Sequence, residues 1–588
     1  MTTASTRPLP PAEVSKPTIQ EPAVVISALQ RLANSGLVVF CVLTVLYFGL
    51  SLFASPDAYL STDVGGKTGA LAAMMERGDW STDLGYWAEG ADPSGDVFPF
   101  AHTTLTASGW WVNTTSLPMV LAARPLWAIG GAQLALLIPM MAAAGAAVVA
   151  GKLQQRLRPS GGRSAMWVVG LSTPVAVYAL DFWEHSIGVL LMGLGALWVL
   201  DAAETELADV RHAGRRTAAA LGGGVAFGLA ATMRQEALVY GFVAGLALTG
   251  ALIAGSSRSP IALLRSVAPS VVMAGGAVVV LLANSAVERW FYGEAFRSTR
   301  SAGAAASAGS EQGERVDATF TTLLSPINAI HPIATFFGLG LIAGLTWLVI
   351  VVRRSGDVRP PSLLLIALAM ILGLRVVQFG PSFVPGMVPT APLVVAGAAL
   401  GFATNRHKLV AAMALLPLPL IHLTQYSAGA VPQWGGRYLL ATGFLLVVIA
   451  CAELPRRNLA VFRGLVVAGL LVTASGVWFN AFRTNSLAND FDLIEEVADG
   501  DVVVWYDPVK AREAGPEIVE HRWLSTVGGR LDDRMLEVLA DESIDRFVYV
   551  DGVDEDPGLF DGFEAVSAVG EWELSTVLQQ RLTIYQRS

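Results

Sequence analysis

The chain alternates between long apolar segments and short polar turns from residue 35 to about residue 480. Each apolar segment holds roughly 15–22 residues, and about 20 apolar residues in a helix cross the hydrocarbon core of a bilayer. The pattern therefore predicts a polytopic α-helical membrane protein with about 13 spans. The expected spans are residues 35–54, 131–151, 165–180, 186–202, 217–232, 237–255, 267–286, 331–352, 362–380, 384–403, 409–424, 438–453 and 464–480.

Two connecting segments are too long to be simple turns. The first, residues 55–130, includes a stretch at 68–77 expected to be helical and an apolar stretch at 117–127 that prolines interrupt. An interrupted apolar stretch favours a helix lying in the membrane interface over a span. The second segment, residues 287–330, carries a run of small residues at 298–310, which is typical of a mobile loop.

The two ends of the chain differ from the middle. Residues 1–34 are rich in Pro, Thr and Ala, which predicts a disordered tail. From about residue 485 to residue 588 the sequence becomes polar and acidic. Alternating apolar residues predict strands at 502–506, 546–551 and 582–586, and a helix at 533–540, so this region is expected to be a small α/β domain.

The basic residues gather at alternate ends of the apolar segments. Lys and Arg close to a span favour the cytoplasmic side, so this alternation predicts the topology. The clusters are Lys152 to Arg163, Arg211 to Arg216, Arg258 and Arg265, Arg353 to Arg359, Arg406 and Lys408, and Arg456 to Arg463. With an odd number of spans, the tail 1–34 is cytoplasmic, and the two long loops and the domain 485–588 lie on the outer face of the cell membrane.

Composition agrees with this picture and excludes other classes. Hydrophobic residues make up 53% of the 588 residues and charged residues only 15%, which is too apolar for an ordinary soluble enzyme. No basic stripe suggests a nucleic-acid partner. The two cysteines, Cys41 and Cys451, both lie in apolar segments, so no disulfide framework is expected.

The first candidate site residue is Asp63, in the sequence Asp63-Val-Gly-Gly-Lys67 just beyond the first span. An acid near the membrane surface can act as a general base or as a metal ligand. The two glycines would let the backbone approach a ligand, and Lys67 could balance a phosphate. The competing interpretation is a polar loop with a lysine at the lipid headgroups.

A second candidate group is the tight turn Asp181-Phe-Trp-Glu184-His185. If this turn is helical, the two carboxylates and the imidazole share one face and could bind a divalent cation or orient an acceptor hydroxyl. The alternative is a simple polar turn with an interfacial tryptophan.

Two outer arginines run against the charge bias. Arg234 and Glu236 form another short turn, and Arg437 follows Trp434-Gly-Gly at the start of a late span. A guanidinium at headgroup depth suits a lipid-linked phosphate, although an internal ion pair or interfacial anchoring would explain these residues as well.

Together these features resemble the GT-C superfamily of polyprenyl-phosphate-sugar-dependent glycosyltransferases, in the aminoarabinose transferase and protein O-mannosyltransferase branch. The resemblance rests on Asp63 after the first span, the interfacial segment 117–130, the acids at 181–185, the Arg437-Tyr438 pair and the outer domain. It implies Asp63 as the catalytic residue, Arg437, Lys67 and Arg234 as ligands of the donor phosphate, and Asp181, Glu184, His185 and Glu236 as contacts of the acceptor or a metal.

The resemblance also implies a reaction and its partners. A sugar would pass from a polyprenyl-phosphate carrier to an envelope acceptor at the outer face, with inversion, and a divalent cation such as Mg²⁺ or Mn²⁺ could assist. The paired acids of many family members are absent here, because Val64-Gly65 follows Asp63. A transporter or lipid flippase, and a non-catalytic envelope assembly protein, are the alternative functions.

Overall fold

The computed structural model describes residues 33–58, 62–113, 116–159, 161–204, 210–255, 259–295, 312–325, 383–424, 434–527, 530–552, 560–567, 571–575 and 578–588. Four predictions lie outside these ranges: the tail up to residue 32, the small-residue run 298–310, and the spans at 331–352 and 362–380.

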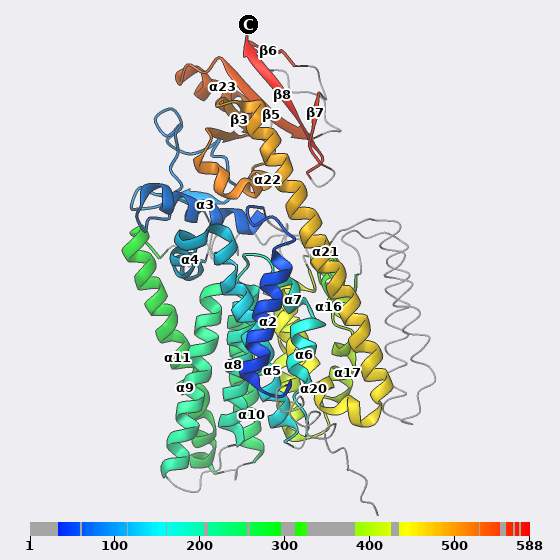
Figure 1. Cartoon of the computed structure of the whole chain (residues 1–588). Helices are drawn as coiled ribbons and strands as arrows, with labels where there is room; N and C mark the ends of the chain where they lie inside the picture. The colour runs from blue at the N-terminus through cyan, green and yellow to red at the C-terminus, as the bar shows by residue number, and fades with distance from the viewer. Residues whose placement is uncertain are drawn as a thin grey trace, which may run out of the picture.

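A bundle of apolar helices forms most of the described chain (Figure 1). Its first half contains α2 (Gly36–Ser51), α5 (Leu137–Leu157), α6 (Ser164–Leu171), α7 (Pro174–Tyr178), α8 (His185–Glu204), α9 (Val210–Met233), α10 (Ala237–Ala254) and α11 (Pro260–Tyr292). Its second half contains α13 (Gln312–Leu324), α16 (Met387–Thr390), α17 (Leu393–Leu400), α18 (Asn405–Leu415), α19 (Pro417–Thr424), the 3₁₀ turn η1 (Arg437–Leu439), α20 (Leu440–Arg457) and α21 (Leu459–Ala498).

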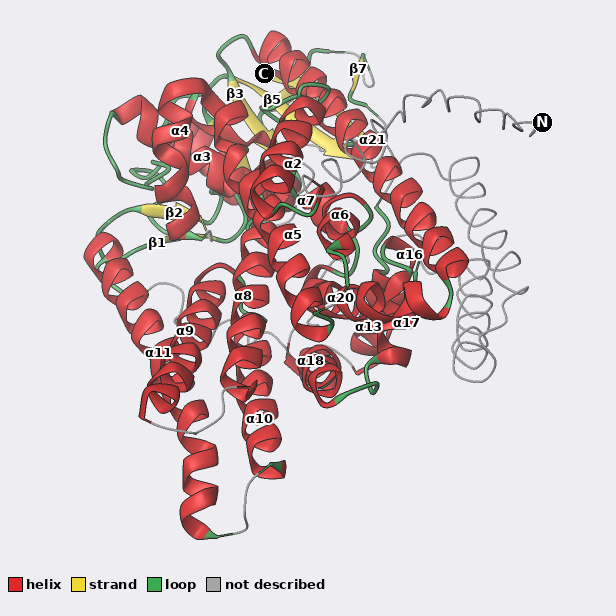
Figure 2. Ribbon diagram, turned by 60° about the horizontal axis from the view of Figure 1, so that its bottom comes forward, coloured by secondary structure: helices red, strands yellow, loops and turns green. Residues whose placement is uncertain are grey.

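The burial of these helices fits a membrane environment. Helix α20 lies in the middle of the bundle and is almost wholly buried, whereas α11 at the edge exposes large apolar side chains such as Leu264, Val279 and Leu282. Figure 2 shows α9, α10 and α11 reaching together to one end of the molecule. Exposed leucine and valine along a peripheral helix are what a lipid-facing surface requires.

In the described part of the chain, seven helices are long and apolar enough to cross a membrane, judged by length and composition. Several predicted spans are divided between two helices, among them the following two. The segment 165–180 is divided between α6 and α7, because Thr173 caps a new helix that starts at Pro174. The segment 384–403 forms the short helices α16 and α17, separated by Ala391 and Pro392.

The loop 55–130 folds over one end of the bundle. It contains α3 (Thr62–Arg77), the hairpin β1 (Thr103–Leu105) and β2 (Trp111–Asn113), and the beginning of α4 (Leu117–Ala135). The helix predicted at 68–77 begins six residues earlier at Thr62, so Asp63 and Lys67 belong to it. The backbone of α4 is kinked at Gly130 and Gly131, where the second glycine has a φ of 61°.

The C-terminal region is a mixed sheet with the strand order β4-β3-β5-β8-β6, and β7 pairs with β8. Strand β3 is parallel to β4 and β5, and β8 is antiparallel to β5. The elements are β3 (Val502–Trp505), α22 (Pro508–Ala511), the 3₁₀ segment η2 (Arg512–Val519), β4 (Trp523–Ser525), α23 (Arg530–Asp541), β5 (Arg546–Gly552), β6 (Phe563–Ala565), β7 (Trp572–Glu573) and β8 (Gln580–Arg587).

The predicted strands at 502–506, 546–551 and 582–586 are found as β3, β5 and β8, and the predicted helix at 533–540 as α23. Helix α21 continues for 40 residues from the bundle into this domain, so the expected division at residue 485 falls inside a helix (Figure 1). The sheet domain is therefore joined to the bundle by one continuous helix.

Charges of different kinds lie at the two ends of α8. At its C-terminal end, Glu204 Oε1 lies 2.7 Å from Arg406 Nε, and Asp201 Oδ1 lies 2.7 Å from Arg156 Nη2, so two of the basic clusters meet there. At its N-terminal end lie Glu184 and His185. A helix of 20 residues is about 30 Å long, close to the thickness of a hydrocarbon core.

Candidate functional site

Four separate elements bring the predicted residues to the sheet end of the bundle. The first turns of α3 carry Asp63 and Lys67, and the link between α7 and α8 carries Glu184. Arg234 and Glu236 occupy the turn from α9 to α10. Arg437 begins η1 directly after Gly436, whose φ of 72° lies in the left-handed region that favours glycine.

A continuous chain of ion pairs joins these residues. Lys67 Nζ lies 2.5 Å from Glu184 Oε2, and Arg234 Nη1 lies 3.2 Å from the other oxygen of Glu184. Arg234 Nε then donates to Glu236 Oε1 at 2.8 Å. All four side chains are almost completely buried, so each charge depends on its neighbour for compensation.

Asp63 lies beside these linked ion pairs and has two guanidinium partners of its own. Its Oδ2 is 3.2 Å from Arg437 Nη2, and its Oδ1 is 3.4 Å from Arg512 Nη2. About a third of the Asp63 side chain is exposed (32%), whereas the Arg437 side chain is 17% and the Arg512 side chain 4% exposed. A carboxylate that both contacts buried cations and remains reachable can serve as a base for an incoming hydroxyl.

The surrounding charges control how the carboxylates ionise. Burial alone would raise the pKa of Asp63, but the Arg437, Arg512 and Lys67 cations hold it well below its usual range. Burial would likewise raise the pKa of Glu184, yet Lys67 and Arg234 lower it to about 2. Both groups are therefore anions at neutral pH.

His185 is buried against aromatic rings. Its imidazole stacks on Tyr178 at a centroid distance of 4.4 Å and an angle of 7°, with Trp183 at 4.7 Å. Tyr178 in turn donates its hydroxyl proton to the carbonyl oxygen of Trp434 at 2.6 Å. Among the described residues, neither ring nitrogen of His185 has a hydrogen-bond partner.

Residues 181–185 do not form the helical turn that the sequence left open, and the alternative of a polar turn fits the structure. The backbone turns at Asp181 and Phe182, and α8 begins only at His185. Asp181 Oδ1 accepts from the backbone N–H of Phe182 at 3.0 Å, a local bond that competes with helix formation. Asp181 is buried, but the carboxylate that reaches the cationic residues is that of Glu184.

From the sequence we expected the two glycines after Asp63 to let the backbone approach a ligand. In the structure, other parts of the protein lie against them instead. A methyl group at Gly65 would lie 1.5 Å from the carbonyl oxygen of Arg512, and one at Gly66 would lie 2.1 Å from Asn113 Oδ1. These glycines let η2 and β2 of the protein itself pack closely on α3. The close contact delivers Arg512 to Asp63.

Arg512 was missed in the sequence because it lies 449 residues from Asp63, in a polar region read as a separate domain. Its neighbour Glu513 accepts from Arg483 Nη2 on α21 at 2.6 Å, so η2 is fixed on two sides. The one available signal was the pair of glycines after Asp63, which requires some backbone to approach α3.

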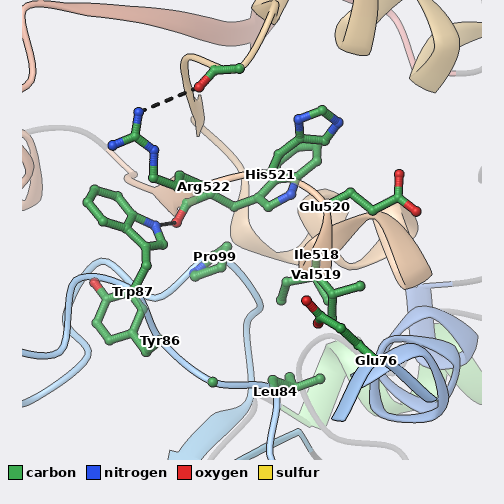
Figure 3. Close-up of a pocket in the computed structure, with 13 residues that line it drawn as sticks. Glu76, Leu84, Tyr86, Trp87, Pro99, Ile518, Val519, Glu520, His521 and Arg522 are labelled. Atoms are coloured by element: carbon green, nitrogen blue, oxygen red, sulfur yellow. Dashed lines mark hydrogen bonds between the residues drawn. The ribbon is translucent and has the colours of Figure 1, made fainter. Parts of the chain in front are cut away.

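Among the described residues, one group has the spacing of metal ligands, namely Glu517, Glu520 and His521. It lies at the far end of η2, where Glu520 and His521 line a cleft of about 390 Å³ together with Glu76 and Trp87 (Figure 3). The acids expected to hold a metal are placed differently, because Glu184 and Glu236 are neutralised by Lys67 and Arg234. The expected Mg²⁺ or Mn²⁺ site at these acids stays untested, and the pairing of both carboxylates with cations argues against it.

No family model matches the chain, and no curated protein matches its sequence. Its fold is similar to that of the archaeal oligosaccharyltransferase AglB from Archaeoglobus fulgidus, solved with an inhibitory peptide and a dolichol-phosphate. That match covers 87% of this chain and 69% of the other, at 12% identity and a TM-score of 0.44.

A second similar structure is ArnT from Cupriavidus metallidurans bound to undecaprenyl phosphate. This match covers 93% of this chain and 97% of the other, at 14% identity and a TM-score of 0.40. At this identity and TM-score the likeness concerns the fold alone.

Proposed function

We propose that the chain is a membrane glycosyltransferase that moves a sugar from a polyprenyl-phosphate carrier to an acceptor of the cell envelope. The observation that carries the proposal is the partly exposed Asp63 carboxylate held between buried guanidinium groups at one end of the helix bundle. A base beside buried cations is what the transfer of a phosphate-linked group to a hydroxyl requires.

The topology proposed from the sequence places this site on the outer face of the cell membrane. About 13 spans would leave the tail 1–34 in the cytoplasm and the loops 55–130 and 287–330 outside, with the domain 485–588 on the same side. The meeting of the Arg156 and Arg406 clusters at the opposite end of α8 supports this orientation, since both clusters belong to one side.

In the proposed reaction Asp63 takes the proton of an acceptor hydroxyl. The acceptor oxygen bonds to the anomeric carbon while the bond from that carbon to the phosphate oxygen breaks on the opposite side, so the sugar inverts. Polyprenyl phosphate leaves with the bonding electron pair. Arg437 stabilises the leaving phosphate, and Lys67 and Arg234 are proposed as further contacts of that phosphate.

Glu184 and Glu236 have a positioning role in this scheme. They hold Lys67 and Arg234 at short distances and keep these cations from turning away from the site. Asp181 and His185 are both buried, and His185 packs on Tyr178. They are proposed as acceptor or metal contacts on the resemblance alone.

The test is transfer from a lipid-linked sugar. Purified protein in nanodiscs would be given a polyprenyl-phosphate sugar labelled in the sugar, and release of polyprenyl phosphate would be measured with an envelope extract as acceptor. We expect release by the wild-type protein and a loss of at least about 100-fold in Asp63→Asn. Asp79→Asn, an exposed acid beyond the end of α3, is the matched control.

The alternative functions give different results in the same assay. A flippase would move the intact lipid-linked sugar between leaflets and release no polyprenyl phosphate. A non-catalytic assembly protein would do neither. Equal release by wild-type and Asp63→Asn protein would show that Asp63 is not the base.

A further inference from the structure

The second guanidinium beside Asp63 comes from the C-terminal domain. Arg512 begins η2, and only 3% of the residue is exposed. Its backbone carbonyl is pressed against Gly65, and the carbonyl of Gly515 lies 2.9 Å from the place of a methyl group at Gly69. The domain is therefore in direct backbone contact with the helix that carries the proposed base.

The contacts of Asp63 with the two arginines are long for charge-assisted hydrogen bonds. Such bonds are usually about 2.7–2.9 Å. Here the distances are 3.2 Å to Arg437 and 3.4 Å to Arg512. In addition, the Nε atoms of both arginines are buried and have no hydrogen-bond partner among the described residues. Each guanidinium thus retains donors that Asp63 does not use.

The charges near Asp63 are also unequal. Glu184 is matched by Lys67, and Glu236 by Arg234. Asp63 then faces both Arg437 and Arg512 as a single carboxylate. A buried excess of positive charge with unused planar donors favours an anion that can accept several hydrogen bonds. The phosphodiester of a lipid-linked sugar, which becomes a phosphate monoester when the sugar is transferred, is such an anion.

We propose that Arg512 is a phosphate-binding residue of the site, acting with Arg437 so that the phosphate of the lipid-linked donor is held from both the bundle and the C-terminal domain. In the free protein the Asp63 carboxylate is the ion-pair partner of both guanidinium groups. When the donor binds, its phosphate replaces Asp63 as their partner and leaves the carboxylate available to the acceptor hydroxyl. The proposal rests on the proposed function and adds the C-terminal domain to its active site.

The experiment measures lipid binding by the full-length protein in nanodiscs. Three probes separate the sources of phosphate: undecaprenyl phosphate, undecaprenol and inorganic phosphate. We expect the wild-type protein to prefer undecaprenyl phosphate over undecaprenol. Arg512→Gln should weaken that binding by about 10- to 100-fold and leave undecaprenol binding unchanged.

Two controls keep the result specific. Arg522→Gln removes an exposed guanidinium of the same domain and should bind as the wild type does. Gly65→Ala keeps every charged residue but forces η2 away from α3, so it should weaken undecaprenyl phosphate binding as Arg512→Gln does. Gly49→Ala, in α2 with open space around the added methyl group, should have no effect.

The outcomes separate the two proposals. If the wild-type protein does not distinguish undecaprenyl phosphate from undecaprenol, the proposed function fails. If it does, and a folded Arg512→Gln binds undecaprenyl phosphate as tightly as the wild type, the role of Arg512 is overturned. Binding of inorganic phosphate with no preference for the lipid would contradict a lipid-linked donor. Should Arg512→Gln not fold, Arg512→Lys keeps the charge without the planar donors and should show a smaller loss.

Discussion

Glu184 is the residue whose removal should disturb the site most without touching Asp63. Its two oxygens contact Lys67 at 2.5 Å and Arg234 at 3.2 Å, and the residue is 8% exposed. In Glu184→Gln the carboxylate charge is lost while Lys67 remains buried at 2% exposure. Arg234 still has Glu236 as an ion-pair partner, so most of the lost stability comes from the buried and unpaired Lys67 ammonium.

Two arguments give the same magnitude for this change. Breaking a buried ion pair by removing one partner costs about 3–5 kcal/mol of stability. The pKa of Glu184, held near 2 by Lys67 and Arg234 against burial, corresponds to roughly 3 kcal/mol of stabilisation at neutral pH. We therefore expect Glu184→Gln to lose about 3 kcal/mol.

The matched control is Glu204→Gln at the other end of α8. Glu204 pairs with Arg406 at 2.7 Å, but these side chains are 20% and 43% exposed, so the pair is worth less than about 1 kcal/mol. Unfolding of both variants and the wild type would be followed in detergent by heat and by denaturant. Equal losses of stability in the two variants would refute the claim that the linked ion pairs of Lys67, Glu184, Arg234 and Glu236 act as one buried electrostatic unit.

Three further predictions concern the reaction and its conditions. Arg437→Lys should retain part of the transfer activity and Arg437→Gln less than about 1%, because only the guanidinium offers planar donors to a phosphate; steady-state release of polyprenyl phosphate measures both. The cations beside Asp63 lower its pKa, so kcat/KM should keep its value down to about pH 4. On acidification, kcat should begin to decrease at a higher pH than kcat/KM does, because in the complex the bound phosphate takes up those cations and the pKa of Asp63 is lowered less. If kcat and kcat/KM decrease at the same pH, this reasoning is contradicted. Transfer should continue in excess chelator, because Glu184 and Glu236 already have cationic partners, and abolition of activity that Mg²⁺ or Mn²⁺ restores would contradict that expectation.

The stability should also depend on pH in a defined direction. The pKa of Glu184 is lowered on folding, so its contribution is fully present above the ordinary value of 4.5 and disappears as the pH falls from there towards 2. The midpoint of thermal unfolding should drop across this window in the wild type. Glu184→Gln should show a smaller drop, and identical pH profiles would argue against the assignment.

The sequence predicted that several of the site residues would lie at the same end of the bundle. Asp63, Glu184, Arg234 and Arg437 were grouped because each follows or precedes an apolar segment on the same side, and the structure brings them together. This inference succeeds because a helix that crosses a bilayer fixes which end each flanking residue occupies.

Other features depend on contacts that no local pattern encodes. The approach of Arg512 to Asp63 requires η2, an irregular segment whose position is set by Gly65 and by Arg483 on α21. The break between α6 and α7 could have been read from Thr173 and Pro174, but the apolar residues on both sides favoured one continuous span. The turn at Asp181 depends on a side-chain bond to the backbone, which spacing alone does not reveal.

The most direct test of the account is a structure of the full-length protein in nanodiscs with undecaprenyl phosphate. We expect the phosphate within hydrogen-bonding distance of both Arg437 and Arg512, with the Asp63 carboxylate no longer paired to either guanidinium and open to the side from which an acceptor would arrive. A phosphate bound away from these arginines, with Asp63 still in contact with both, would contradict the central claim that this site binds a lipid-linked donor.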